Sequence, residues 1–210
     1  MYNDVTGIIL SGGKSSRMGE NKSIMKIGNR NVIEYVTDLM KSLFNKVILI
    51  TNDPDDYKFL DLEMYADIFL RMGPLAGIHS GLNNSKTIKN FIISCDIPLM
   101  KAAMIKYLTE FKTDKPITIA KADGFIQQLC GVYDKKCLPA AEEILSSQNE
   151  TSTMHNGSKK IRCKVLDLID KIGAEIIDAE SLPFYEKDIY FNMNRKSDFK
   201  IVLQKLTIHI

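Results

Sequence analysis

A glycine-rich segment over residues 10–22 carries the strongest chemical signal in the sequence. It reads Leu-Ser-Gly-Gly-Lys-Ser-Ser-Arg-Met-Gly-Glu-Asn-Lys and directly follows an apolar, β-branched run. Glycines let backbone N–H groups approach phosphate oxygens closely, and Lys14, Arg17 and Lys22 supply positive charge. The segment therefore favours a polyanionic ligand over an ordinary strand-to-helix turn with solvated charges.

The spacing within this segment excludes two familiar phosphate-binding motifs. Gly13-Lys14-Ser15 matches the end of a P-loop, but the first glycine of that motif would fall at Ile8. A G-x-G-x-x-G dinucleotide fingerprint is also absent. Phosphate binding here requires a different kind of loop.

Asp96 is the candidate metal ligand. It follows an apolar run over 90–95 and precedes Pro98, so it is expected at the carboxyl end of a strand, where open parallel sheets bind their ligands. Mg²⁺ is commonly held by one carboxylate together with phosphate oxygens and water. A turn or a helix cap after the strand is the structural alternative.

Two pairs of polar residues are ambiguous by themselves. Asn52 and Asp67 have the neighbours of ordinary turn residues. Asn192 and Asn194 are expected to alternate along a strand, so that both side chains point to the same face. A hydrogen-bonded pair at a sheet edge would explain them equally well.

Together the motifs resemble those of the nucleotidyltransferases. The segment from Leu10 to Lys22 is similar to their signature L-A-G-G-x-S-x-R-M-G-x-D-K. Gly-Pro-Leu-Ala-Gly at 73–77, Cys-Asp-Ile-Pro at 95–98 and Phe-Asn-Met-Asn at 191–194 follow in the order of that family. Within the superfamily the pattern most resembles the molybdenum cofactor guanylyltransferases, which join the GMP part of GTP to molybdopterin and release pyrophosphate.

The sequence departs from the family pattern at three places. Asn21 stands where the signature usually has Asp. Gln127-Gln128-Leu129 replaces the common Q-P-L, and Arg-Lys-Ser-Asp at 195–198 replaces T-P-E-D. The last departure bears on the pterin side of the site and leaves the nucleotide side intact.

The resemblance implies a role for each candidate. Lys22, Arg17 and Asp96 would be catalytic, and Asp96 would also hold Mg²⁺. Asn52 and Asp67 would contact guanine, whose N1–H and N2–H₂ groups are donors that suit amide and carboxylate acceptors. Asn192 and Asn194 would lie on the molybdopterin side. The expected GTP-binding set is Leu10, Ser11, Gly12, Gly13, Lys22, Asn52, Asp67 and Asp96.

Other functions remain open at this level. A related nucleotidyltransferase could use CTP, or a sugar phosphate as its acceptor, and a nucleotide-binding module could have lost catalysis. The resemblance also admits an accessory GTP-binding protein and apo-molybdoenzymes as partners, besides GTP and molybdopterin as substrates.

Composition excludes several other classes of protein. The net charge of the 210 residues is only +2, without the basic excess of a nucleic-acid binder. Four cysteines without a C-x-x-C pair and three histidines argue against zinc and fit a reducing cytoplasm. No apolar run reaches the length of a membrane helix, and the start of the chain does not resemble a signal peptide.

The elements that must position these residues alternate between strand and helix. This pattern predicts an α/β protein: one Rossmann-like three-layer domain over 1–210 with a mostly parallel, twisted sheet, as in nucleotide-diphospho-sugar transferases. Its N-terminal part would bind GTP and its C-terminal part would contribute to the molybdopterin site. The polar stretch 146–160 is expected to form a mobile surface loop. Strands are expected at 6–10, 46–51, 66–70, 90–95 and 116–120, and helices at 31–44, 75–82, 104–111 and 198–206.

Overall fold

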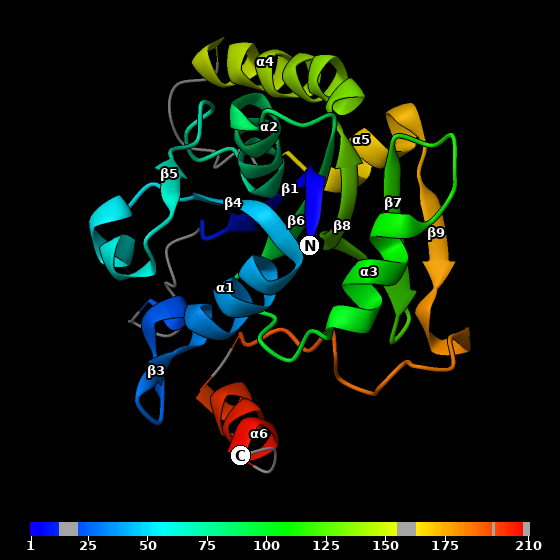
Figure 1. The fold of residues 1–210 in the computed structure, drawn as a ribbon. Coiled ribbons are helices and arrows are strands. Elements are labelled where there is room, and N and C mark those ends of the chain that lie inside the picture. Colours follow the sequence, from blue (N-terminus) through cyan, green and yellow to red (C-terminus); the bar gives the residue numbers. More distant parts are fainter. Residues whose placement is uncertain (13–20, 155–162, 195, 208–210) are drawn as a thin grey trace.

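The computed structural model describes residues 1–12, 21–154, 163–194 and 196–207. Within them, seven strands form one sheet in the order β5-β4-β1-β6-β8-β7-β9 (Figure 1). β8 is antiparallel to both of its neighbours, and the other pairings are parallel, so the mostly parallel sheet is confirmed. The strands are β1 (Tyr2–Leu10), β4 (Phe44–Ile50), β5 (Glu63–Tyr65), β6 (Lys89–Ser94), β7 (Ile117–Ala122), β8 (Phe125–Asp134) and β9 (Glu175–Asp178).

Helices cover both faces of this sheet (Figure 1). One face packs against α1 (Val32–Leu43) and α3 (Ala102–Glu110). The other packs against α2 (Pro74–Asn84), α4 (Leu138–Met154) and α5 (Val165–Ile172). This is the expected three-layer α/β arrangement. In the part of the chain that the structure describes, no helix has the length and apolar character needed to cross a membrane.

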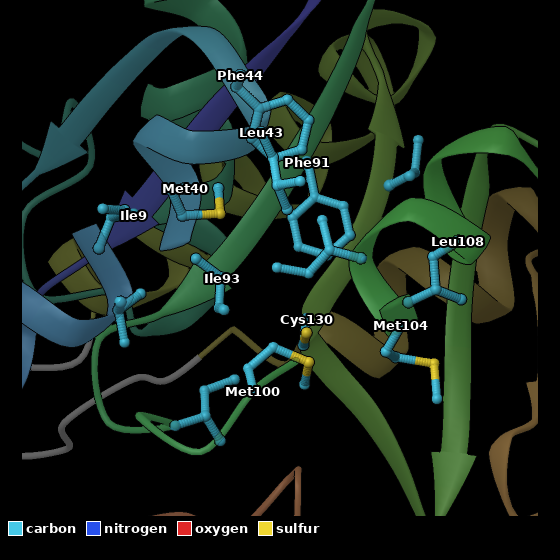
Figure 2. Packing of buried hydrophobic residues seen from close by; sticks show 14 of the residues in the cluster. Ile9, Met40, Leu43, Phe44, Phe91, Ile93, Met100, Met104, Leu108 and Cys130 are labelled. Atoms are coloured by element: carbon cyan, nitrogen blue, oxygen red, sulfur yellow. The ribbon is translucent and has the colours of Figure 1, made fainter. Parts of the chain in front are cut away.

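Alternating residues of the central strands feed two separate hydrophobic cores. In β1, Ile9 belongs to the core under α1 and α3, whereas Ile8 and Leu10 belong to the core under α2 and α4. Figure 2 shows part of the first core, where Phe91 and Ile93 of β6 lie among side chains from α1, α3 and β8. A strand buried on both faces must be apolar at every position, which explains the continuous apolar runs in the sequence.

A third, smaller core joins residues 27–32 to the C-terminal part of the chain. The short strands β2 (Lys26–Ile27) and β3 (Arg30–Asn31) form a hairpin whose turn includes Gly28, with φ of 61°. After β3, the backbone N–H of Asn31 donates to Glu34 Oε2 at 2.6 Å and so caps α1. Ile27 and Val32 pack against Met193 and against Val202 of the C-terminal helix α6 (Lys196–Thr207).

The strand expected at 66–70 is wrong, because the edge strand β5 ends at Tyr65. The following amides find side-chain acceptors and do not join the sheet. The N–H of Asp67 donates to Asn52 Oδ1 at 3.0 Å, and that of Ile68 donates to Ser80 Oγ at 2.8 Å. Once these groups are satisfied, the chain has no need to extend the ladder.

The loop expected at 146–160 is also wrong as far as Met154, because α4 continues to that residue. Ala140, Ala141 and Leu145 are buried against the core under α2, so the helix is already nucleated when it reaches the polar stretch. Extending a formed helix adds one hydrogen bond for each residue, and this outweighs weak intrinsic propensity. Residues 155–160 lie outside the described part of the chain.

Gly131 on β8 is packed too closely against the neighbouring strand to accept a side chain. A Cβ there would lie 2.5 Å from the Thr118 carbonyl oxygen and 2.6 Å from Ile119 Cγ2, both on the neighbouring strand β7. A backbone atom at that distance cannot move aside without disturbing the pairing. We therefore expect Gly131→Ala to lower the free energy of unfolding by about 1–3 kcal/mol. Urea denaturation would measure this, with Gly12→Ala as control because no heavy atom of the described residues lies within 4 Å of its Cβ position. Equal stability of the two variants would contradict the packing argument.

Candidate functional site

The site lies at the carboxyl ends of four parallel strands. The last residues of β1, β4, β5 and β6 pair in register: Leu10 lies opposite Ile50 and Ser94, and Ile50 lies opposite Tyr65. After β1 the chain adds β4 and β5 on one side of it and then β6 on the other side, and open α/β sheets bind ligands where the strand order reverses in this way. The polar residues that follow these strands are Ser11, Gly12, Asn52, Asp67 and Asp96.

Backbone hydrogen bonds continue past the strands and hold this edge together. Ser11 N donates to the Ile50 carbonyl at 2.9 Å, and Cys95 N donates to the Leu10 carbonyl at 3.0 Å. Among the described residues outside its own chain neighbours, none places a heavy atom within 4 Å of a Cβ built on Gly12. Gly13 and Arg17, two of the predicted site residues, lie outside the described part of the chain.

Lys22 meets the other end of the chain at this edge. It begins the short 3₁₀ helix η1 (Lys22–Ile24), and its Nζ donates to Asn194 Oδ1 at 2.8 Å. The expected strand carrying Asn192 and Asn194 is not formed, because the chain over 191–194 has no regular structure. Asn194 instead accepts from Lys22, and Asn192 donates from its amide to the Tyr190 carbonyl at 3.2 Å. The side chain of Asn194 therefore holds Lys22, whereas Asn192 lines a cavity.

Asp96 is tied to the same C-terminal segment. Its backbone carbonyl accepts from Met193 N at 2.9 Å, which is why 191–194 follows the end of β6 without adding a strand. Its carboxylate accepts from Ser94 Oγ at 2.6 Å through Oδ1. As predicted, this carboxylate stands directly after a buried strand at the ligand-binding edge of the sheet.

Burial and nearby charges shift the pKa of the neighbouring Cys95 thiol. Burial and then the negative charge of Asp96 raise its pKa to about 12, while the hydrogen bond with Ser11 and the positive charge of Lys22 act in the opposite direction. The thiol is therefore neutral near pH 7 and is no nucleophile.

Asn52 and Asp67 are brought together as a reciprocal pair. Asn52 Nδ2 donates to Asp67 Oδ2 at 2.9 Å, and the backbone N–H of Asp67 donates back to Asn52 Oδ1 at 3.0 Å. Burial raises the pKa of Asp67 above its ordinary value of 3.8, and the amide of Asn52 lowers it. Asp67 Oδ1 lies 3.7 Å from the Cβ position of Gly77, so the start of α2 packs directly beside this carboxylate.

A cavity of about 460 Å³ lies beside Asn192, Ile97 and the first half of β8. Because β8 is antiparallel, its first half lies at the edge where the parallel strands end. Polar groups on the cavity wall come from β8, from the start of α5 and from the C-terminal segment. The lining residues are Pro74, Ile97, Ile126, Gln127, Gln128, Leu129, Cys130, Cys163, Lys164, Val165, Leu166 and Asn192.

Comparison with known proteins identifies the family. A model of the MobA-like NTP transferase domain matches residues 7–161. A protein of Carboxydothermus hydrogenoformans named "probable molybdenum cofactor guanylyltransferase" is 32% identical over 203 residues, covering 96% of each chain. This chain belongs to the MobA-like NTP transferase family. It is a nucleotidyltransferase by that membership.

Further relatives cover the same length. A molybdenum cofactor guanylyltransferase of Desulfosudis oleivorans is 30% identical and covers 93% of each chain. The crystal structure of molybdopterin-guanine dinucleotide biosynthesis protein A from Archaeoglobus fulgidus matches the fold with a TM-score of 0.78 at 20% identity, covering 96% of this chain and 98% of that one.

Of the residues that line the cavity in this MobA-like transferase, the sequence singled out only Asn192 as a site residue. Lys164 precedes α5 and brings a cation to the cavity wall, but in the sequence it is one lysine among many. In the sequence, Gln127 and Gln128 stand out only as departures from the family pattern. A polar residue directly before an apolar helical stretch was the available signal for Lys164, and it is too common to single out a site.

The pairing of Asn52 with Asp67 can be tested by titration. Because the Asn52 amide stabilises the charged carboxylate, we expect Asn52→Ala to raise the pKa of Asp67 further above its ordinary value. Carbon-13 NMR of the carboxyl group would follow the titration. Asn29→Ala removes an exposed asparagine from the β2–β3 turn and serves as control. An unchanged or lowered pKa in Asn52→Ala would refute the pairing.

Proposed function

We propose that this protein transfers GMP from GTP to molybdopterin, forming molybdopterin guanine dinucleotide and pyrophosphate. The observation that carries the proposal is the connection between Lys22 and Asp96. Asn194 accepts from the Lys22 ammonium, and the adjacent Met193 donates to the backbone of Asp96. Residues 193 and 194 thus link Lys22 to the end of β6, where Asp96 stands near Gly12, an arrangement suited to a nucleoside triphosphate.

The chemistry of this transfer demands charge neutralisation more than a base. A terminal phosphate of molybdopterin attacks the α-phosphorus of GTP in line, the new P–O bond forms, and the bond to pyrophosphate breaks. The nucleophile is already an anion, so the barrier lies in bringing anions together. Lys22, with Arg17 and Lys14 of the same sequence segment, would supply the opposing charge, and Ser11, Gly12 and Gly13 would orient the phosphates.

The donor set suits Mg²⁺ held mainly by the substrate. In the part of the chain that the structure describes, no three His, Cys, Asp or Glu side chains gather as a protein-built metal cage. Asp96 supplies a single carboxylate, and Mg²⁺ is typically bound by one or two carboxylates with phosphate oxygens and water. Bound there, the ion would neutralise phosphate charge while Ser94 keeps the Asp96 carboxylate oriented.

Asn52 and Asp67 would select the base. Guanine presents N1–H and N2–H₂ donors along one edge, and the Asp67 carboxylate offers acceptors to them. Cytosine lacks that pair of donors. The hydrogen bonds between Asn52 and Asp67 fix the carboxylate before the nucleotide arrives, which lowers the entropic cost of recognition.

The cavity beside Asn192 would receive the acceptor. Its volume of about 460 Å³ falls in the range of small-molecule sites. Apolar walls from Ile97, Ile126 and Leu129 suit a flat ring, and the amides of Gln127 and Gln128 suit its polar edge. Lys164 offers a cation to the acceptor phosphate, so each substrate would have its own source of positive charge.

Removal of either charged residue should stop the reaction. We expect Lys22→Ala and Asp96→Ala each to lower kcat at least about a hundredfold, because each deletes charge stabilisation at the transferring phosphate. Pyrophosphate release from GTP and molybdopterin would measure turnover, and thermal melting would verify folding. Lys106→Ala, an exposed lysine on α3, is the matched control. Near-normal turnover in either site variant would overturn the assignment.

Nucleotide choice provides an independent test. At equal concentrations with Mg²⁺, GTP should raise Tm more than ATP, CTP or UTP, since a ligand stabilises the folded state according to its affinity. Asp67→Asn should reduce the advantage of GTP, because an amide presents one acceptor where the carboxylate presents two. Asp114→Asn, an exposed residue after α3, is the control. A larger Tm shift with CTP would favour a cytidylyltransferase instead.

A further inference from the structure

The hydroxyl of Tyr57 is the centre of a buried polar network beside the site. Tyr57 lies in the 3₁₀ helix η2 (Pro54–Leu60) and is only 2% exposed. Its oxygen is 2.7 Å from Ser11 Oγ, 2.8 Å from Asn21 Nδ2 and 2.7 Å from Ser23 Oγ. Ser11 and Asn21 stand near opposite ends of the glycine-rich sequence segment, so one phenol connects both.

Counting protons gives this network a single direction. Asn21 Oδ1 accepts from both the backbone N–H and the hydroxyl of Ser23, at 3.2 and 2.7 Å. The only hydroxyl proton of Ser23 is therefore used, and Tyr57 must donate its own proton to Ser23. Tyr57 then accepts from Ser11 and from Asn21, which fills the capacity of a phenol. Asn21, Tyr57 and Ser23 form a closed ring of hydrogen bonds.

Asp56 explains why position 21 is an asparagine here. The amide nitrogen of Asn21 also donates to Asp56 Oδ2 at 3.3 Å, so both its donor and acceptor sides are used. An aspartate, the usual residue in the signature, has no proton to give to Tyr57 when it is ionised. It would also place a second carboxylate against Asp56, and like charges at that distance repel.

We propose that Tyr57 is a positioning residue for Lys22, acting through Asn21, and that Asn21 and Asp56 are a matched pair in this chain. The proposal rests on the proposed function for the role of Lys22. Asn21 caps η1, whose first residue is Lys22. The backbone of Lys22 is thus held by the Tyr57 network, while its ammonium is held by Asn194. A cation anchored at both ends stays aligned with the phosphate that it neutralises.

The hydrogen-bond network can be tested without any reaction. Ser23 N–H donates to Asn21 Oδ1, so its hydrogen exchange reports whether the cap is formed. Tyr57→Phe keeps the buried ring and removes the hydroxyl, and it should accelerate exchange at Ser23 while Tyr107→Phe, which removes a half-exposed phenol oxygen from α3, should not. Unchanged exchange at Ser23 in Tyr57→Phe would overturn the network.

Kinetics then test the positioning role. Tyr57→Phe should lower kcat/KM for GTP by about tenfold to a hundredfold, the range expected when a catalytic group is displaced by a fraction of an ångström to one ångström. Full activity in Tyr57→Phe would refute the positioning role. If the wild-type protein itself releases no pyrophosphate from GTP and molybdopterin, the proposed function fails, whereas the exchange result at Ser23 still decides the network.

A charge swap tests the matched pair. Asn21→Asp should lower turnover although it restores the usual residue of the signature. Adding Asp56→Asn to it should recover part of the activity, because an amide at 56 can donate to the new carboxylate and the repulsion is gone, although the bond from position 21 to Tyr57 is still missing. Adding Asp55→Asn should recover none, since the exposed Asp55 is paired with Lys58. A double variant with Asp56→Asn that is no more active than Asn21→Asp would contradict the pairing.

Discussion

The parallel pairing of β1 with β4 and β6 is the constraint on which the site depends. Parallel neighbours need crossover connections, so the carboxyl ends of β1, β4, β5 and β6 share one edge. The polar residues that follow these strands, among them Ser11, Asn52 and Asp96, therefore stand at this edge. The antiparallel strand β8 adds to the same edge from the opposite direction. The polar residues after the parallel strands and the first half of β8 therefore lie at the same edge.

Positive charge is concentrated locally in a protein of nearly balanced total charge. The net charge is +2, yet Lys22 is fixed by an asparagine 172 residues away and Lys164 lies on the adjoining cavity. An unanchored lysine samples many rotamers, and holding it costs conformational entropy at the moment of reaction. The Tyr57 network and Asn194 remove much of that cost in advance, because they hold the backbone and the ammonium of Lys22 separately.

The sequence predicted the elements that satisfy their own backbone and bury continuous apolar runs. β1, β4, β6 and α1 lie where their patterns placed them. Prediction was wrong where tertiary partners satisfied the backbone differently. The backbone amides of Asp67 and Ile68 donate to side chains, and the backbone N–H of Met193 donates to the carbonyl of Asp96. The polar second half of α4 continues a helix whose first half is packed in the core. Such partners are distant in sequence, so they cannot be predicted from local composition.

By itself the sequence determined the chemistry available: a glycine-rich segment with three cations and one carboxylate after an apolar run. Only the tertiary structure decided which of these groups meet. It paired Asn52 with Asp67, separated Asn192 from Asn194, and placed Tyr57 between Ser11 and Asn21. The chemistry of each residue can be read from the sequence, but contacts between distant side chains depend on strand order and register, which no single segment specifies.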